Sequence, residues 1–179
     1  MKKFFSLMLC VCAALPLLLT GCSQPADETD TLSLGFGVYA VTGNEDATED
    51  KNGTSKISLT FASVLVDENG KIVRCFLDAA DHTASFTPDG KAVDAPSFQT
   101  KYEQGDAYGM KIYGGAKGEW YEEANAFCAL VEGKTMDGVK ALVASDGKGT
   151  DEVIRAGCTI SVSEFVMAIE NAVKNIVKN

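Results

Sequence analysis

Asp78, Asp81 and His82 are the residues whose types and spacing first suggest catalysis. A histidine beside a carboxylate can act as a general base, and together the three side chains offer metal ligands. Because His82 is the only histidine, most multi-histidine metal sites are excluded. The three residues come just after a predicted strand, and a polar cluster in such a loop is usually solvated. We therefore predict no catalytic set and no metal site, and we expect a role other than that of an enzyme.

A second chemically interesting segment, residues 102–121, combines aromatic side chains with five glycines. Its aromatic residues are candidate ligand contacts: Tyr102, Tyr108, Tyr113, Trp120 and Tyr121. Glycine lets a backbone approach a ligand closely, and these side chains offer a flat apolar face with a polar tip. Two interpretations stay open: a loop that stacks on a planar ligand or partner, and a loop that caps the core.

The N-terminal residues predict an export signal. Lys2 and Lys3 precede an apolar run over residues 4–19, too short for an ordinary membrane-spanning helix. The run ends in Leu19-Thr20-Gly21-Cys22, which resembles the lipobox of bacterial lipoproteins. The resemblance implies that residues 1–21 are removed and that Cys22 carries a diacylglyceryl group. We expect an exported protein, anchored by lipid on the extracytoplasmic side of the cell membrane.

Residues 22–31 are polar and predict a flexible tether, which leaves residues 32–179 as a single domain. Three cysteines remain in this domain: Cys75, Cys128 and Cys158. Apolar neighbours favour buried thiols over redox or metal groups. Three thiols allow at most one disulfide, and the sequence does not decide whether it forms.

The chain is strongly acidic, with 25 acidic and 16 basic residues and a formal net charge of −9. Nucleic acids and anionic lipid headgroups repel such a surface. We therefore predict no nucleic-acid partner. The expected partners are the membrane, through the lipid anchor, and an unknown small molecule or protein.

The elements of the domain follow from periodicity. Alternating apolar residues predict strands over residues 32–42 and 57–66, with a solvated acidic loop over 43–55 between them. Asn69-Gly70 predicts a hairpin turn because both residue types tolerate positive φ, and residues 71–77 form the returning strand. A short strand over residues 83–87 leads into a turn at 88–90.

Helices are predicted in the second half. Residues 119–132 place apolar side chains on one face, and Thr135 starts a shorter helix. Ser161 and Glu164 form a capping box before a last apolar stripe. These elements predict an α+β fold: a mainly antiparallel sheet with β-hairpins in the N-terminal half and about three helices packed on one face.

Several short stretches together resemble a family of bacterial exported lipoproteins that has no established activity. They are 66–67, 70–72, 75–78, 100–101, 105–111, 119–122 and 133–135. The resemblance runs from about Ile57 to the C-terminus and implies a fold and an extracytoplasmic location.

Residues 155–159 resemble a second pattern, the segment that carries flavin in FMN-binding domains of membrane electron-transfer proteins. In those domains a strand, a short Asp-(Ser/Thr)-Gly-Ala-Thr segment and an amphipathic helix follow one another, and FMN is esterified to the threonine. The resemblance implies Thr159 as the attachment residue, with Gly157 and Cys158 beside it. A helix N-terminus nearby would suit a phosphate. Arg155, Ala156 and Cys158 depart from the pattern.

Two functions therefore remain. The first is a non-catalytic binding or interaction module. The alternative is an electron-transfer lipoprotein that carries FMN at or near Thr159.

Overall fold

The computed structural model describes residues 31–93 and 98–177. Within them, three long strands form one antiparallel sheet in the order β1-β2-β3. The strands are β1 (Ser33–Glu45), β2 (Gly53–Val66) and β3 (Ile72–Phe86). The predicted α+β fold with an antiparallel N-terminal sheet is confirmed. The predicted signal peptide, Cys22 and all of the tether except Thr31 lie outside the described residues.

All three strands are longer than predicted. β1 continues to Glu45 and β2 begins at Gly53, so the acidic loop is shorter than expected. β3 runs unbroken across the residues predicted to form a loop after Leu77, and it pairs with β2 as far as Gly53. Backbone pairing with an existing neighbour keeps polar residues in a strand although their side chains give no apolar alternation.

The predicted hairpin turn joins β2 to β3, but its geometry differs from the prediction. Gly70 has a φ of 74°, whereas Asn69 does not adopt positive φ. The amide of Gly70 donates to the carbonyl of Asp67 at 3.1 Å. One Asp67 carboxylate oxygen also accepts from the amides of Asn69 and Lys71, at 2.9 and 2.8 Å. The aspartate therefore stabilises the turn and only the glycine has to be left-handed.

The helical part of the described chain has two long helices and several short ones. The long helices are α3 (Trp120–Val131) and α6 (Ser163–Lys174). The short ones are α1 (Lys101–Gln104), a 3-10 turn at Gly105–Tyr108, α2 (Met110–Gly114), α4 (Met136–Lys140) and α5 (Asp151–Ala156). The predicted helices correspond to α3, α4 and α6. The other short helices are too brief to produce a readable apolar period.

The capping box predicted for the last helix is wrong. Val162 is the N-cap of α6 and makes no side-chain cap bond. The hydroxyls of Ser161 and Ser163 instead donate to the carbonyl of Gly147, at 3.0 and 2.9 Å. The backbone of Ser161 also forms an isolated antiparallel β-bridge with Lys148. Contacts with a distant loop therefore replace the local cap.

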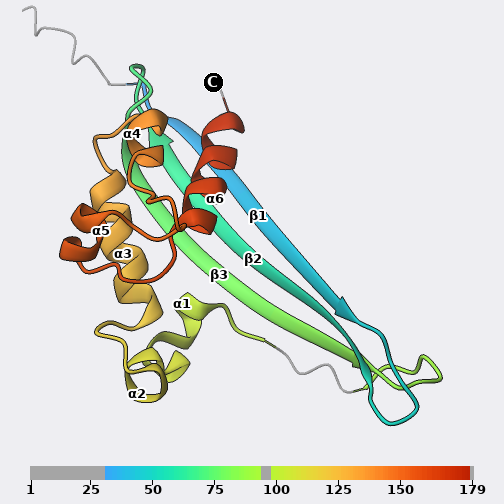
Figure 1. Cartoon of the computed structure of the whole chain (residues 1–179). Helices are drawn as coiled ribbons and strands as arrows, with labels where there is room; N and C mark the ends of the chain where they lie inside the picture. The colour runs from blue at the N-terminus through green and yellow to red at the C-terminus, as the bar shows by residue number, and fades with distance from the viewer. Residues whose placement is uncertain (1–30, 94–97, 178–179) are drawn as a thin grey trace, which may run out of the picture.

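The helices cover one half of the sheet on one face (Figure 1). α6 packs on β1 and β2, and α3 packs on β3. Gly35 and Gly37 of β1 lie under α6, and a Cβ added at Gly37 would sit 2.2 Å from the backbone nitrogen of Ala172. These glycines allow the helix to contact the strand backbone directly.

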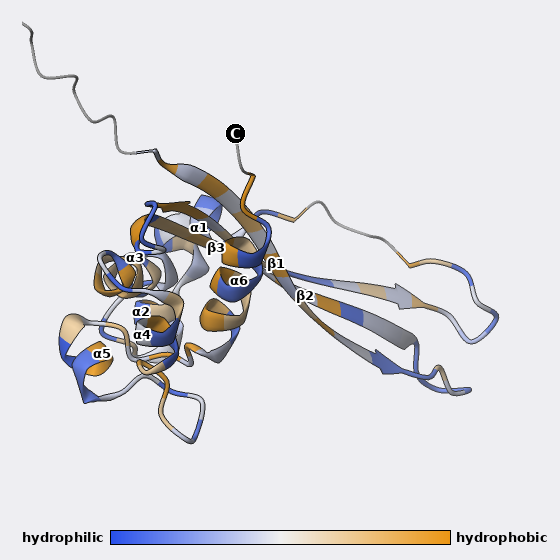
Figure 2. Ribbon diagram, turned by 90° about the horizontal axis from the view of Figure 1, so that it is seen from above, coloured by the Kyte–Doolittle hydropathy of each residue, from blue (hydrophilic) through white to orange (hydrophobic). Residues whose placement is uncertain are grey.

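Beyond the helices the three strands continue as a bare ribbon (Figures 1 and 2). Every residue of β1 from Ala40 to Glu45 is exposed, whereas the core lies between α3, α6 and the near half of the sheet. Its largest fully buried apolar side chains include Phe127, Ile72, Leu77 and Ile169. In the part of the chain that the structure describes, no helix combines the length and apolarity needed to cross a bilayer.

Candidate functional site

A pocket of about 290 Å³ opens where the helical layer ends and the sheet continues. Its floor is formed by Thr60 of β2 and Ala79 of β3. Its walls are Lys101, Tyr108, Met110 and Trp120 on one side and Ile160, Ser161, Glu164 and Phe165 on the other. This Lys101–Trp120 pocket is therefore assembled from the sheet, Lys101 with the glycine-aromatic segment (residues 102–121), and the start of α6.

Lys101 is the central charged group of the pocket. Its side chain is only 17% exposed, and its Nζ lies 3.0 Å from Oδ2 of Asp81 on β3. The same nitrogen lies 5.4 Å from the ring centroid of Tyr108 and 5.9 Å from that of Trp120. Cations are attracted to aromatic faces at such distances. The ammonium is therefore held by one carboxylate and two rings.

The local structure around α1 explains how Lys101 reaches this position. Thr100 caps α1 in a capping box with Glu103, and this box fixes the start of the helix. The amide of Tyr102 donates to Oδ1 of Asp78 at 3.1 Å, which ties α1 to the edge strand β3. The lysine side chain then runs along the sheet to Asp81.

The Asp81–Lys101 pair changes the pKa of both groups. Burial disfavours the Asp81 carboxylate, but hydrogen bonds from Ser58 and Lys101 and the lysine charge outweigh it, so the pKa of Asp81 falls below its ordinary value. Burial likewise disfavours the Lys101 ammonium, yet Asp81 and Tyr108 raise its pKa above the ordinary value. Both groups are therefore charged at neutral pH.

A buried carboxylate, Glu119, holds the wall that contains Lys101, Met110 and Trp120. Glu119, which is 1% exposed, accepts from the amides of Met110 and Lys111 at 2.7 and 3.1 Å. It thereby satisfies the free N–H groups at the start of α2. Next to it, the Trp120 ring packs edge-on against Phe165 of α6, with centroids 5.6 Å apart. The pocket wall is consequently tied to both long helices.

Glu164 supplies an acceptor at the α6 side of the pocket. Its Oε2 accepts from the hydroxyl of Thr60 at 3.3 Å. Because an ionised carboxylate can accept more than one hydrogen bond, this contact does not exhaust it. The pocket therefore presents a cationic donor and an anionic acceptor between apolar walls.

The five aromatic candidates from the sequence divide into three groups. Tyr108 and Trp120 line the pocket. Tyr102 and Tyr121 contact each other edge-on at 6.0 Å beside a separate, shallower hollow. Tyr121 donates its hydroxyl to Asp106 at 3.0 Å, and this bond raises the pKa of the tyrosine. Tyr113 is 87% exposed and does not line the pocket.

The loop predicted to hold Asp78, Asp81 and His82 is wrong, because all three residues lie within β3. Successive side chains of a strand point to opposite faces, so Asp81 faces away from Asp78 and His82. Asp78 accepts from backbone amides, and His82 packs against Phe98 with ring centroids 5.0 Å apart. The three side chains do not converge, and among the described residues no group of three metal-binding side chains does.

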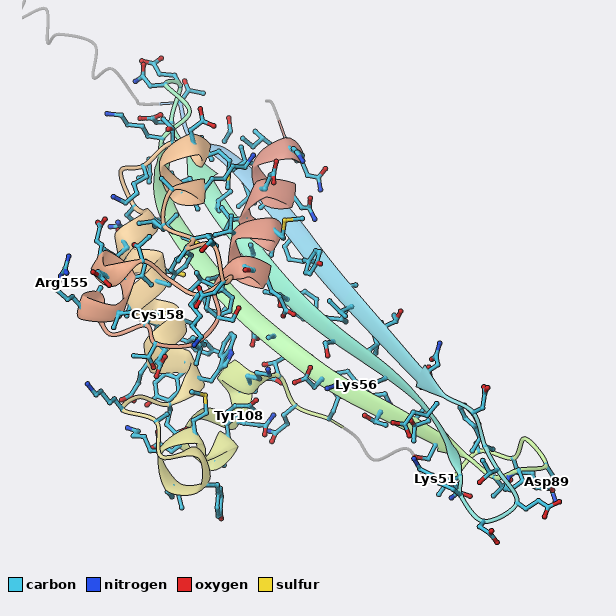
Figure 3. All side chains as sticks on the ribbon, in the orientation of Figure 1. Lys51, Lys56, Asp89, Tyr108, Arg155 and Cys158 are labelled. Carbon is cyan, nitrogen blue, oxygen red and sulfur yellow. The ribbon has the colours of Figure 1, made fainter. Side chains whose placement is uncertain are left out.

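The implied flavin segment has a different setting from the one expected. Residues 151–156 form α5 rather than a strand, and Gly157 ends this helix with a φ of 107°. Figure 3 shows Arg155 on the outer side of α5. Thr159 lies outside α6, which begins only at Ser163.

Glu123 occupies the groups that a phosphate at Thr159 would use. It is fully buried, and its Oε2 accepts from the amides of Thr159 and Ile160 at 2.7 and 3.1 Å. The Thr159 hydroxyl also lies 3.0 Å from both Glu123 oxygens. A phosphodiester at Thr159 would have to displace this hydroxyl contact and would place a second negative charge beside the carboxylate.

The three cysteines are free thiols in the structure. Cys128 and Cys158 are buried and Cys75 is half-buried. A hydrogen bond with Cys128, followed by burial, raises the pKa of the Cys75 thiol, and burial raises that of Cys158 to about 12. Thiols that stay protonated are poor nucleophiles, so neither Cys75 nor Cys158 is prepared for nucleophilic chemistry.

Three important residues gave no readable signal in the sequence. Lys101, Glu119 and Glu123 sit among exposed-type polar residues, and glutamates near a helix start are common for electrostatic reasons alone. Their burial arises only when distant segments fold over them. The apolar face predicted for α3 did identify its neighbours correctly: Trp120, Ala124, Phe127, Cys128 and Val131 are all buried.

Comparison with known proteins gives one relative of limited extent. The chain is 28% identical to a chlorophenol reductase of Desulfitobacterium hafniense over 113 residues, covering 56% of this chain and 35% of that protein. It therefore spans about a third of the relative's length. No protein-family model matches the chain. No solved structure matches it either.

Proposed function

We propose that this protein is an exported lipoprotein, anchored through Cys22, that acts as a non-catalytic binding module for a small aromatic molecule. The observation that carries the proposal is the Lys101–Trp120 pocket, where a half-buried ammonium lies beside two aromatic rings at an opening in the surface. A binding site of this kind combines apolar walls with a few placed polar groups.

The sequence similarity supports an aromatic ligand. The relative is named a chlorophenol reductase, and its name associates part of this sequence with a protein that acts on an aromatic compound. Chlorophenols therefore belong in the first ligand screen, together with sugars, peptides, haem and flavins.

A thermal-shift screen of the mature domain tests the binding module. We expect a stabilising ligand whose effect is lost in Tyr108→Ala, because this side chain lines the pocket. Tyr113→Ala is the matched control: it removes the same side chain from the same segment, but at an exposed position. Equal ligand binding by the two variants would exclude the pocket as the site.

The anchor is tested separately in a bacterial host that processes lipoproteins. The full-length chain should fractionate with membranes, and Cys22→Ala should release it because the acyl chains are lost. Membrane association that persists in Cys22→Ala would contradict lipid anchoring through this residue.

A second function, an FMN-carrying electron-transfer lipoprotein, is favoured by the name of the relative, which is a reductase. In this case the exported protein should be yellow and heavier by one FMN, and Thr159→Ala should abolish both properties. A colourless protein of unmodified mass, produced beside an active flavin transferase, would exclude covalent flavin. The Glu123 contacts of Thr159 make this the less favoured function.

A further inference from the structure

The charges around the Lys101–Trp120 pocket restrict the chemistry of its ligand. Lys101 contributes one positive charge, but Asp81 lies 3.0 Å from its ammonium and already compensates it. Glu164 adds a carboxylate on the opposite wall. One carboxylate beside the pocket and one on its wall therefore accompany a single ammonium, so a ligand with its own negative charge is disfavoured.

The volume and lining of the pocket restrict the size and the apolar character of its ligand. About 290 Å³ is near the lower end for small-molecule sites, so a single ring with small substituents fits better than a larger cofactor. The apolar part of the wall comes from Ala79, Tyr108, Met110, Trp120, Ile160 and Phe165. An aromatic ring matches this wall better than a sugar does.

The two charged groups of the pocket, Lys101 and Glu164, require a ligand that can both accept and donate a hydrogen bond. The Lys101 ammonium only donates hydrogen bonds, and the Glu164 carboxylate only accepts them. An uncharged hydroxyl does both: its oxygen accepts and its O–H donates. A ligand without such a group would leave one or both of these partly enclosed charges less well solvated.

We propose that the pocket selects phenols, that is, small aromatic rings with an uncharged hydroxyl group, over aromatic carboxylates, ethers and amines. This inference rests on the proposed binding function and names its ligand class. Lys101 and Glu164 are the specificity-determining residues, and Tyr108 and Trp120 contact the ring.

The test compares four rings that differ in one substituent: 3-chlorophenol, 3-chloroanisole, 3-chlorobenzoate and 3-chlorobenzylamine. Trp120 is the only tryptophan, so its fluorescence reports directly on the pocket, and calorimetry gives the affinities. At pH 7, where the phenol is uncharged, we expect it to bind at least about tenfold more tightly than the anisole and the benzoate. It should also bind more tightly than the benzylamine, whose protonated amine donates hydrogen bonds but cannot accept one from Lys101.

Two variants test whether Lys101 and Glu164 determine the selectivity. Lys101→Met should weaken 3-chlorophenol binding by about tenfold or more, whereas Lys111→Met, at an exposed lysine that does not line the pocket, should leave it unchanged. Glu164→Gln keeps the shape of the side chain, and Glu164 is an exposed residue, so the variant should fold normally. It should improve 3-chlorobenzoate binding by removing one carboxylate charge.

The possible failures are distinguishable. If chlorobenzoate or chlorobenzylamine binds most tightly, or if all four rings bind equally, the phenol selectivity is overturned while the binding module stands. If none of the four binds but another ligand from the screen stabilises the protein through Tyr108, the ligand class is wrong and the pocket is right. If no ligand binds the pocket at all, both proposals fail.

Discussion

The two halves of the sheet share the same three strands but differ in what lies on them (Figure 1). In the near half, α6 rests directly on the backbone of β1 at Gly35 and Gly37, and the core is buried beneath α3 and α6. In the far half, the strands project without helices, and Gly43 has open space around it. Figure 3 shows Lys51 and Asp89 at this far end.

The candidate pocket lies at the boundary between these halves. Thr60 and Ala79 are still buried, whereas the next exposed residue of β3 is Asp81, the partner of Lys101. Where a helical layer stops above a continuing sheet, side chains from both sides can meet without filling all the space. The comparison indicates that the helix-covered half supplies stability and that its margin holds the candidate binding site.

The largest effect is expected from a substitution that disrupts the packing in the helix-covered half of the sheet. Gly37→Ala places a methyl group against the backbone of α6, which no rotamer change can relieve. We expect a loss of about 3 kcal/mol or more in the free energy of unfolding, measured by chemical denaturation. Gly43→Ala, in the same strand beyond the helices, should change it by less than about 0.5 kcal/mol. Similar losses in the two variants would contradict the division of the sheet.

A second substitution tests the buried Glu123 carboxylate, which accepts hydrogen bonds from Thr159. Glu123→Ala removes the acceptor of two backbone amides and one hydroxyl, so we expect a loss of about 2–5 kcal/mol. Glu123→Gln keeps an acceptor oxygen and should cost less. The exposed Glu152, which pairs with Lys134 at 3.5 Å, provides the control: Glu152→Ala should change stability by about 0.5 kcal/mol. An unaffected melting temperature in Glu123→Ala would rule out this structural role.

The smallest effect concerns the pH dependence of the Asp81–Lys101 pair. Because the folded protein lowers the pKa of Asp81 below 3.8, its contribution is complete above that pH and is lost as the pH falls through the folded value. Asp81→Asn should therefore cost up to about 1 kcal/mol at pH 7, and the difference from the wild type should shrink below pH 3.8. Denaturation curves at pH 7 and pH 3 measure it, and a difference that grows in acid would contradict the assignment.

Much of the fold could be predicted because its signals are local. The alternating residues of β1 and β2, the Asn69-Gly70 turn and the apolar faces of α3 and α6 all depend on neighbours within a few positions. Predictions failed where a distant contact replaced a local preference. β3 continues through polar residues because β2 pairs with it, and Ser161 bonds to Gly147 instead of capping α6.

The candidate site could be predicted only in part. The glycine-aromatic segment was recognised from composition, and two of its five aromatic residues line the pocket. Neither the pairing of Lys101 with Asp81 nor the different positions of Tyr108 and Tyr113 could be predicted, because local composition does not encode the direction of a side chain in an irregular segment.

By itself, the sequence determined the acidic character, the hairpin and the amphipathic helices, since each depends on residue type and short-range order. The export signal stays a prediction. Only the tertiary structure decided which polar side chains meet. Thr60 and Glu164 are 104 positions apart, and Glu123 and Thr159 are 36 apart. Contacts over such separations form when packing of the apolar faces brings the elements together, and the same packing creates the pocket.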